Sequence, residues 1–409
     1  MSLQENVRNH RRRRGWTQER LAEEADLSVG TVRKVEQGGT ASVETIHTLA
    51  RALGTTTSSL FASEAPAPVR EAEGDGPKLT GLRRALMPPI GLTPVAADHA
   101  DRRDLHSLQS DITDSHLLYQ ADRYNSVAKR LPGILRAGEA AVALSDGDER
   151  RQAIATRACA FLLAGKYLTQ VRRYDMAYHA LSRAITDARG MGSTQLAVTG
   201  VVGMCWLLLR QDRFDEAEQL ATATADQVEP RLSTATPAQW AIWGELLLRV
   251  ASAAMRNNRP DVAQQARRMA ATAASALDRE HVDFQEHWAT FGPVTAETKR
   301  IEDLSLIGDA RGVLNLADTG LVGAQALAAY GRPGMNTWGR HRLDVARAHV
   351  QLGSHQDAMN ELTGLKATAS EWLRHQNIAR HVMGDILAKR KRTLTDDMRE
   401  MASHLGIVG

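Results

Sequence analysis

The stretch QERLAEEADLSVGTVRKVEQG, residues 18–38, decides the fold of the N-terminal part of the chain. Its apolar residues recur at helical spacing in two runs, which predicts one helix over 18–25 and another over 29–37. The side chain of Ser28 can accept the hydrogen bond that begins the second of these helices. Gly38 ends it, because glycine adopts the left-handed conformation of a helix C-terminus without strain. The residues expected inside are Leu21, Ala22, Ala25, Val32 and Val35.

Working outward, three further helical segments complete a compact block over residues 1–61. A helix is expected over 4–14 and another over 43–53, and a last short turn returns Leu60 and Phe61 to the core. Five short helices, with a tight turn between the second and the third, form the geometry that lays the third helix in the DNA major groove. We therefore expect a DNA-binding head.

The segment 13–61 resembles the Cro/Xre-type helix-turn-helix of phage repressors and bacterial regulators. The resemblance rests on three motifs, which are TQERLA at 17–22, LSVGTVRKVEQG at 27–38 and TIHTLARALG at 45–54. It covers about 60 residues, and it implies double-stranded DNA as a partner. Heads of this type read half-sites about one helical turn apart. The resemblance therefore also implies a homodimer on a palindromic operator.

Residue roles carry over by position. Gln18 matches the residue that grips a phosphate and braces the base contacts, while Val29, Gly30 and Lys34 fall where the family reads base edges. Lysine and arginine can donate to guanine O6 and N7, whereas valine offers only apolar contact. Gly30 departs from the family's frequent polar residue. Readout is therefore expected to rest on Lys34, Thr31 and Arg33.

Four consecutive arginines, residues 11–14, end the first helix. They lie where a phosphate backbone would pass, and they could add sequence-independent affinity through counterion release. The alternative is a solvated face that benefits from the helix dipole. The complete candidate DNA-binding set is Gln18, Ser28, Val29, Gly30, Thr31, Arg33, Lys34, Arg11 and Arg14.

Length and composition constrain the rest of the chain. The length of 409 residues favours two domains, and the low aromatic content of 4% favours an all-α protein. The net charge is +3. Two cysteines without metal-ligand spacing, a charged N-terminus and no long apolar run predict a cytoplasmic protein that binds no metal and no membrane. We find no Walker A loop, Rossmann fingerprint, nucleophile elbow or zinc-protease motif, so we expect neither an enzyme nor a cofactor.

Residues 62–78 are rich in Pro, Gly, Ala and Glu and are expected to form a flexible linker. The body, 79–409, repeats a pattern of a helix with small residues, a turn, and a second helix with Ala three residues after its first apolar position. The unit centres are Tyr124, Tyr174, Phe214, Pro260 and Ala310, with a sixth 45 residues further on.

These units resemble tetratricopeptide repeats, although their spacing of 40 to 50 residues exceeds that family's usual 34. The resemblance implies an α-solenoid, because one hairpin cannot bury its apolar face alone and stacks on its neighbours around a concave surface. The residues expected to line that surface as ligand-binding candidates are Lys166, Gln170, Trp206, Arg210, Arg249, Arg256, Lys299 and Arg347.

Such a groove is more positive than negative and could bind an acidic or carboxylate-ended ligand, for instance a short peptide. Alternatively, its charges pair with one another along a solvated face. The layout resembles peptide-responsive regulators of Gram-positive bacteria and multi-helix regulators of actinomycetes. It implies a transcriptional regulator whose body senses a peptide or small molecule and controls the geometry of a dimer on DNA. The alternative is an adaptor whose repeats hold a partner protein at DNA.

Overall fold

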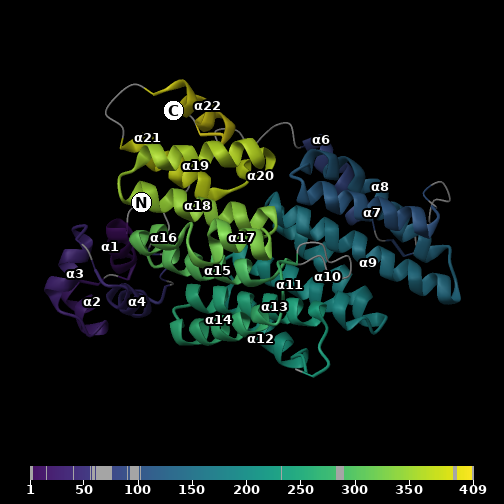
Figure 1. The fold of residues 1–409 in the computed structure, drawn as a ribbon, viewed down its shortest axis with the longest axis horizontal. Coiled ribbons are helices and arrows are strands. Elements are labelled where there is room, and N and C mark those ends of the chain that lie inside the picture. Colours follow the sequence, from purple (N-terminus) through teal and green to yellow (C-terminus); the bar gives the residue numbers. More distant parts are fainter. Residues whose placement is uncertain are drawn as a thin grey trace.

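The computed structural model describes residues 3–407 apart from 15, 40, 56, 58–59, 61–75, 90, 93–100, 102, 232, 282–289 and 390–393. The described residues form helices joined by short turns, and their one β-bridge joins His281 to Phe291. Figure 1 shows the N-terminal helices as a separate group at one end of a larger helical body. The expectation of an all-α protein is therefore confirmed.

The head contains the helices α1 (Leu3–Arg13), α2 (Gln18–Glu24), α3 (Val29–Glu36) and α4 (Val43–Ala52). The last three begin where the sequence predicts, because Thr17, Ser28 and Ser42 each accept a hydrogen bond from the backbone N–H three residues on. Leu60 is buried as expected, whereas Phe61 lies outside the described residues. The buried core of the head is Val7, Leu21, Ala22, Ala25, Val32, Val35, Ile46, Leu49, Ala50, Leu53 and Leu60.

Six helical hairpins make up most of the body. Their helices are α7 (Leu105–Gln120) with α8 (Tyr124–Ala143), α9 (Gly147–Gln170) with α10 (Tyr174–Gly190), α11 (Thr194–Arg210) with α12 (Phe214–Gln227), α13 (Pro237–Arg256) with α14 (Pro260–Ser275), α15 (Pro293–Leu306) with α16 (Ala310–Leu316), and α18 (Met335–Gln351) with α19 (His355–Thr368). Each unit centre predicted from the sequence is the first residue of the second helix of a hairpin.

The same turn joins the two helices in every hairpin. The residue two positions before the second helix has a positive φ, between 58° and 65° at the four non-glycine positions. The next backbone N–H then donates to a carbonyl five residues earlier, as from Arg173 to Leu168 over 2.8 Å. The turn residues are Asp122, Arg172, Asp212, Asn258, Gly308 and Gly353.

Close helix approaches explain the small residues of the repeat pattern. A Cβ added to Gly165 of α9 would lie 2.6 Å from the side chain of Leu181 on α10. Leu181 is itself fully buried. A larger residue at Gly165 would therefore push the two helices of this hairpin apart.

The remaining helices cover the edges of the hairpin array. They are α6 (Gly76–Leu86), the 3₁₀ helix η2 (Gly320–Val322), α17 (Ala324–Tyr330), α20 (Ser370–Arg374), α21 (Asn377–Ala388) and α22 (Asp396–His404). Helix α6 packs on α8, and α22 packs on α19 and α21. Helix α6 begins at Gly76, inside the stretch predicted as linker, and residues 62–75 of that stretch lie outside the described residues.

The first and last hairpins meet, so the array closes on itself (Figure 1). The carboxylate of Asp122 accepts hydrogen bonds from the backbone N–H groups of Glu371 and Trp372 at the start of α20. The Asn125 N–H donates to the Glu371 carboxylate over 2.8 Å. These contacts bridge positions about 250 residues apart, so the two ends of the array lie side by side.

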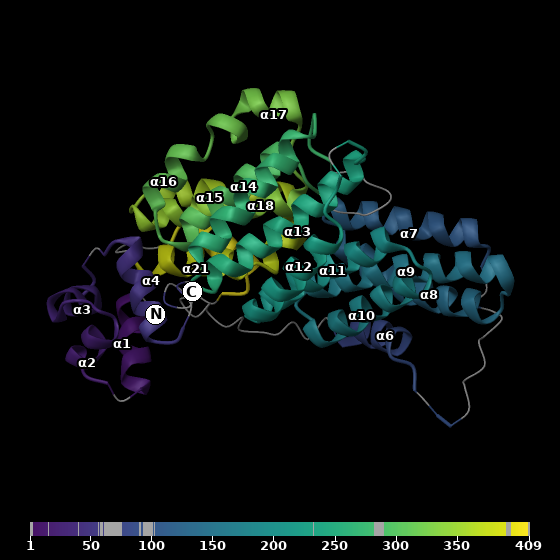
Figure 2. The same ribbon diagram turned by 90° about the horizontal axis from the view of Figure 1, so that it is seen from below.

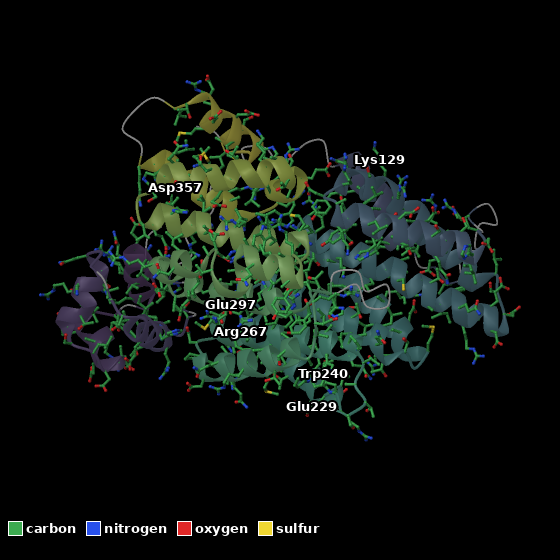
Figure 3. All side chains as sticks on the ribbon, in the orientation of Figure 1. Lys129, Glu229, Trp240, Arg267, Glu297 and Asp357 are labelled. Carbon is green, nitrogen blue, oxygen red and sulfur yellow. The ribbon has the colours of Figure 1, made fainter. Side chains whose placement is uncertain are left out.

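Polar side chains cover the outside of the body. Figure 3 labels Lys129, Glu229 and Asp357 on different parts of the body, and all three are exposed. The head lies against one end of this body (Figure 2). There the Thr57 N–H donates to Asn258 Oδ1 over 2.7 Å, and Asn258 Nδ2 donates to the Thr55 carbonyl. The turn between α13 and α14 therefore holds the head.

Candidate DNA-binding surface and central cavity

Helix α3 turns one face to the core of the head and the other to solvent. Val32 and Val35 are buried, whereas Arg33 and Lys34 are exposed. The helix therefore presents two cations, Arg33 and Lys34, on its solvent-exposed face. Of its other candidate residues, Ser28 and Gly30 are exposed and Val29 and Thr31 are half-buried.

The start of α3 is fixed by its cap. Ser28 Oγ accepts a hydrogen bond from the Thr31 N–H over 3.0 Å and lies 2.8 Å from Thr31 Oγ1. A Cβ added to Gly30 would meet only Ser28 Oγ, at 3.6 Å. The surface at Gly30 therefore has room for a larger residue without a clash inside the head.

A buried carboxylate joins three of the head's helices. Glu36 is 1% exposed, and Arg11 holds it through Nε at 2.7 Å and a terminal nitrogen at 2.9 Å. Gln18 Nε2 donates to the same carboxylate over 2.7 Å. Burial alone would raise the pKa of Glu36, but the hydrogen bonds from Arg11 and Gln18 outweigh it, so the pKa lies below its ordinary value.

This geometry corrects the expectation that Arg11 contacts a DNA phosphate. Its third donating nitrogen reaches the Trp16 carbonyl at 2.8 Å, so the guanidinium is committed inside the head. Arg14 is the other DNA-binding candidate among the four consecutive arginines. It is exposed, and its guanidinium lies 5.1 Å from the ring centre of Trp16. The four arginines therefore do not form one uniform basic surface. Arg11 braces α1 against α3, and Arg14 faces solvent.

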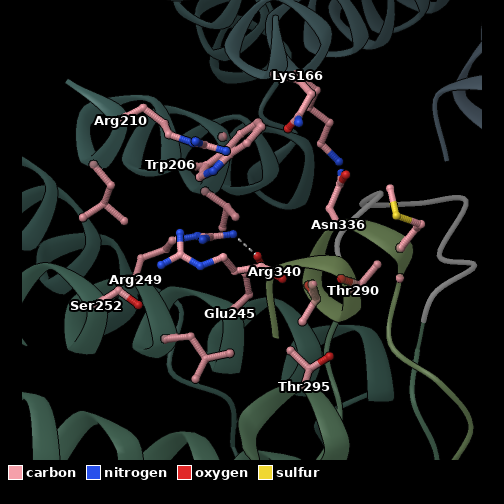
Figure 4. A pocket seen from close by; sticks show the side chains of 18 of the residues that line it. Lys166, Trp206, Arg210, Glu245, Arg249, Ser252, Thr290, Thr295, Asn336 and Arg340 are labelled. Atoms are coloured by element: carbon pink, nitrogen blue, oxygen red, sulfur yellow. Dashed lines mark hydrogen bonds and ion pairs between the residues drawn. The ribbon is translucent and has the colours of Figure 1, made fainter. Parts of the chain in front are cut away.

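The hairpin array lines a cavity of about 650 Å³ that is partly open to solvent. Figure 4 shows Trp206 and Arg249 on one side of it, from α11 and α13, with Lys166 of α9, Asn336 and Thr290 on the other side. Of the eight ligand-binding candidates, all but Arg347 line this space. The seven that the structure brings together are Lys166, Gln170, Trp206, Arg210, Arg249, Arg256 and Lys299.

Positive charge exceeds negative charge around the cavity. Its described lining holds eight cationic side chains, Lys166, Arg172, Arg210, Arg249, Arg256, Lys299, Arg332 and Arg340, and three carboxylates, Asp212, Glu245 and Glu302. Two of these carboxylates already pair. Glu245 binds Arg249, while Glu302 lies 2.7 Å from both Arg256 and Lys299. The pairing alternative considered from the sequence therefore accounts for only some of the cations.

Arg210 is different. Within the described part of the chain no carboxylate forms an ion pair with it, and its guanidinium lies 5.4 Å from the ring centre of Trp206. Burial lowers the pKa of Arg210 to about 10, and the nearby charges of Arg340 and Arg172 also lower it. Burial likewise lowers the pKa of Lys166 to about 8. Both shifts mean that the cavity disfavours the charged forms of its own residues.

An amide in the cavity wall lacks partners altogether. Gln170 is 1% exposed, and neither its side-chain nitrogen nor its oxygen has a hydrogen-bond partner among the residues that the structure describes. Buried polar groups are almost always satisfied, so an exception requires an explanation. Gln170 lies on α9 one turn from Lys166.

A family model described as helix-turn-helix matches residues 7–60, which are the head. The head is a Cro/Xre-type helix-turn-helix domain. Domains of this family bind DNA and are not enzymes. The sequence matches no curated protein.

Three further expectations concern a membrane span, a metal site and the position of Arg347. No helix in the described part of the chain is long and apolar enough to cross a membrane. The described residues contain no cluster of His, Cys, Asp and Glu that could hold a metal ion. Arg347 is half-buried on α18, outside the cavity lining, and burial lowers its pKa.

Sequence reasoning missed the cavity residues that come from the end of the chain. Asn336, Trp372 and Gln376 line it, and Asn336 Nδ2 donates to the Tyr119 hydroxyl over 3.2 Å. The spacing of residues along the first helix of each hairpin carries no sign that the last hairpin returns to the first. The residue closest to such a signal is Asp122, in the turn between α7 and α8. It has a positive φ, and its carboxylate accepts hydrogen bonds from backbone N–H groups of α20.

Proposed function

We propose that this protein is a sequence-specific transcriptional regulator whose Cro/Xre-type head reads a DNA operator. The observation that carries the proposal is the exposed face of α3, where Arg33 and Lys34 project from a helix locked to the head by Val32 and Val35. Regulators with this head lay that helix in the major groove.

We assign the base contacts to the exposed face of α3 and the phosphate contacts to the residues around it. Lys34 and Arg33 donate to base edges, and Val29 and Thr31 approach from the first turn of the helix. Gln18 is held by Glu36 at the start of α2, where a phosphate can meet it. Arg14 is the exposed cation of the neighbouring helix end. Arg11 is left out, because its donors are committed inside the head.

We further propose that the body is a tetratricopeptide-like solenoid that senses a small ligand and sets the geometry of a homodimer on a palindromic operator. Two features support this. The cavity is of small-molecule size. Arg256 of the cavity lining lies two residues before Asn258, which holds the head. A ligand that moved the end of α13 would act on the attachment of the head.

The experiment is DNA binding by the full-length protein to genomic fragments, including its own promoter, at about 50 and about 200 mM salt. We expect one fragment to be retained at the higher salt, with a footprint of two related half-sites. The matched control is the double variant Arg33→Ala with Lys34→Ala, which should lose that fragment. Uniform, salt-sensitive binding that the double variant shares would overturn the proposal.

A further inference from the structure

We propose that the central cavity binds a small organic anion, with its acid group held by Arg210 and the body of the molecule lying flat against Trp206. The inference deepens the proposed sensor role and rests on it for any consequence at DNA. Binding itself does not depend on that role.

The charge balance calls for an anion. Glu245 is used by Arg249, and Glu302 is shared by Arg256 and Lys299. Arg340 pairs with the buried Asp344 at 3.1 Å and reaches Glu302 at 3.7 Å. Arg172 donates to Asn377, and Arg210 has only a long contact of 3.4 Å to Gln376. Arg210 is half-buried, and removing a cation from water without a counter-charge costs free energy. An acid group in the cavity would supply the missing charge.

The shape of Arg210 favours a planar acid such as a carboxylate. A guanidinium presents parallel N–H donors that match the two oxygens of a carboxylate, and such bonds are stronger than those between neutral groups. The guanidinium lies over the ring of Trp206, 5.4 Å from the ring centre. The indole is half-buried, and Leu248 and Val202 are among the apolar residues that line the cavity. These groups offer a flat apolar wall to the rest of the ligand.

Gln170 adds a polar requirement at the same site. Its amide offers two donors and an acceptor, and none of them has a partner among the described residues. Neighbouring side chains cover both polar atoms, so a ligand would bind this amide only if those side chains moved. Hydrogen bonding to this otherwise unpaired group would then discriminate between ligands, because leaving a buried polar group unpaired is costly.

The volume sets the size of the ligand. Small-molecule sites range over roughly 300 to 1,000 Å³, and this cavity falls within that range. Its walls come from both ends of the closed array, since Tyr119 and Arg172 face Asn336 and Asn377. An occupant held at Arg210 and Trp206 binds only the folded body, so it should stabilise the body against unfolding.

Thermal unfolding of the full-length protein tests the proposal with matched pairs of probes. The acids are benzoate, indole-3-acetate and 2-naphthoate, and each is compared with its uncharged carboxamide at up to about 10 mM. Saturating a site stabilises the folded protein, so at least one acid should raise the unfolding temperature by about 2 °C or more. Its carboxamide should have less than a third of that effect.

Variants locate the site. Arg210→Met should abolish the shift, and Arg210→Lys should weaken it because the charge stays while the fork is lost. Arg300→Met removes an exposed arginine paired with Glu297 and serves as the control that keeps the shift. The proposal is overturned if no acid exceeds its carboxamide, or if Arg210→Met responds as the unaltered protein does. DNA binding without any probe is measured separately, so a failed operator and a failed ligand site are told apart.

Discussion

The backbone N–H of Thr57 donates to the side-chain oxygen of Asn258 over 2.7 Å, although 201 positions separate the two residues. Thr57 is 2% exposed, and its hydroxyl also lies 2.8 Å from His47 Nδ1. Asn258 has a φ of +58°, which presents its side chain outward from the turn between α13 and α14. The recurring turn of the body thus supplies the residue that holds the head.

Asn258→Ala should loosen the head from the body. The change leaves the buried N–H of Thr57 without a partner, a loss of about 1–3 kcal/mol. We expect hydrogen exchange at Thr57 to accelerate about tenfold or more, while exchange in α9 stays unchanged. Asn257→Ala is the matched control, since Asn257 donates to Asp215 and not to the head. Equal exchange in both variants would contradict the contact.

Arg11→Ala should destabilise the head rather than remove a single DNA contact. It strands the buried Glu36 carboxylate, and breaking a buried ion pair costs about 3–5 kcal/mol. Hydrogen exchange should show lost protection across α1 and α3, and binding to all DNA should fall together. The exposed neighbour Arg12 gives the control Arg12→Ala, with an effect within about 0.5 kcal/mol. A protected head that binds DNA only slightly less well would restore Arg11 as a phosphate contact.

Lys34→Ala should separate base readout from phosphate binding. A good base contact is worth about 1–3 kcal/mol, so specific DNA should lose that affinity while random DNA loses less. Arg14→Ala should instead weaken both similarly and reduce the salt slope by about one. Competition titrations at two salt concentrations measure both. Equal losses for Lys34→Ala on specific and random DNA would make Lys34 a phosphate contact.

Local signals explain why the head could be predicted closely. The three capping side chains and the period of the buried residues fix α2, α3 and α4 from neighbouring positions alone. The same is true of the hairpins, whose second helices begin at every predicted centre. The role of Arg11 could not be predicted this way. Its partner lies 25 residues away, and a run of four arginines gives no sign that one of them is buried.

The sequence predicted several residues that line the cavity, but it did not predict that the two ends of the array meet there. Lys166, Gln170, Trp206 and Arg210 share one face of two successive first helices, and helical spacing is enough to group them. Closure depends on pairs such as Asp122 with Trp372, 250 residues apart. Spacing within one helix carries no information about such pairs, so Trp372 could be expected only as core.

Stability of the body should fall as the pH drops below 6.5. Burial lowers the pKa of His116 to about 2, and the nearby charge of Lys166 adds to the shift. As the pH falls below about 6.5, the His116 imidazole is therefore protonated in the unfolded chain but stays neutral in the folded protein. This contribution is complete above pH 6.5 and is lost at about 1.4 kcal/mol per pH unit below it, or about 2 kcal/mol by pH 5.

Urea unfolding of His116→Gln measures that contribution. The variant should lack this part of the slope between pH 7 and 5, whereas His106→Gln, at an exposed position, should keep it. An unchanged slope in His116→Gln would mean that the imidazole is protonated in the folded protein.

Binding of an acid in the cavity should weaken as the pH rises through about 8. Burial lowers the pKa of Lys166 to about 8, with Glu245 opposing and Arg249 adding to the shift. Below this pH the ammonium is present to attract the ligand, and above it the proton must be taken up on binding. The affinity should therefore fall by up to tenfold per pH unit until the pKa of the complex is reached. Arg210 keeps its charge over this range, since its pKa is about 10.

Calorimetric titration with the acid that gives the largest thermal shift, from about pH 6.5 to about 9.5, tests this expectation. The carboxylate of the probe stays ionised throughout, so any pH dependence comes from the protein. Lys166→Met should bind more weakly at pH 7 and show a flat profile. A profile that is flat in the unaltered protein, or that falls equally in Lys166→Met, would remove Lys166 from the site and leave the acid group to Arg210 alone.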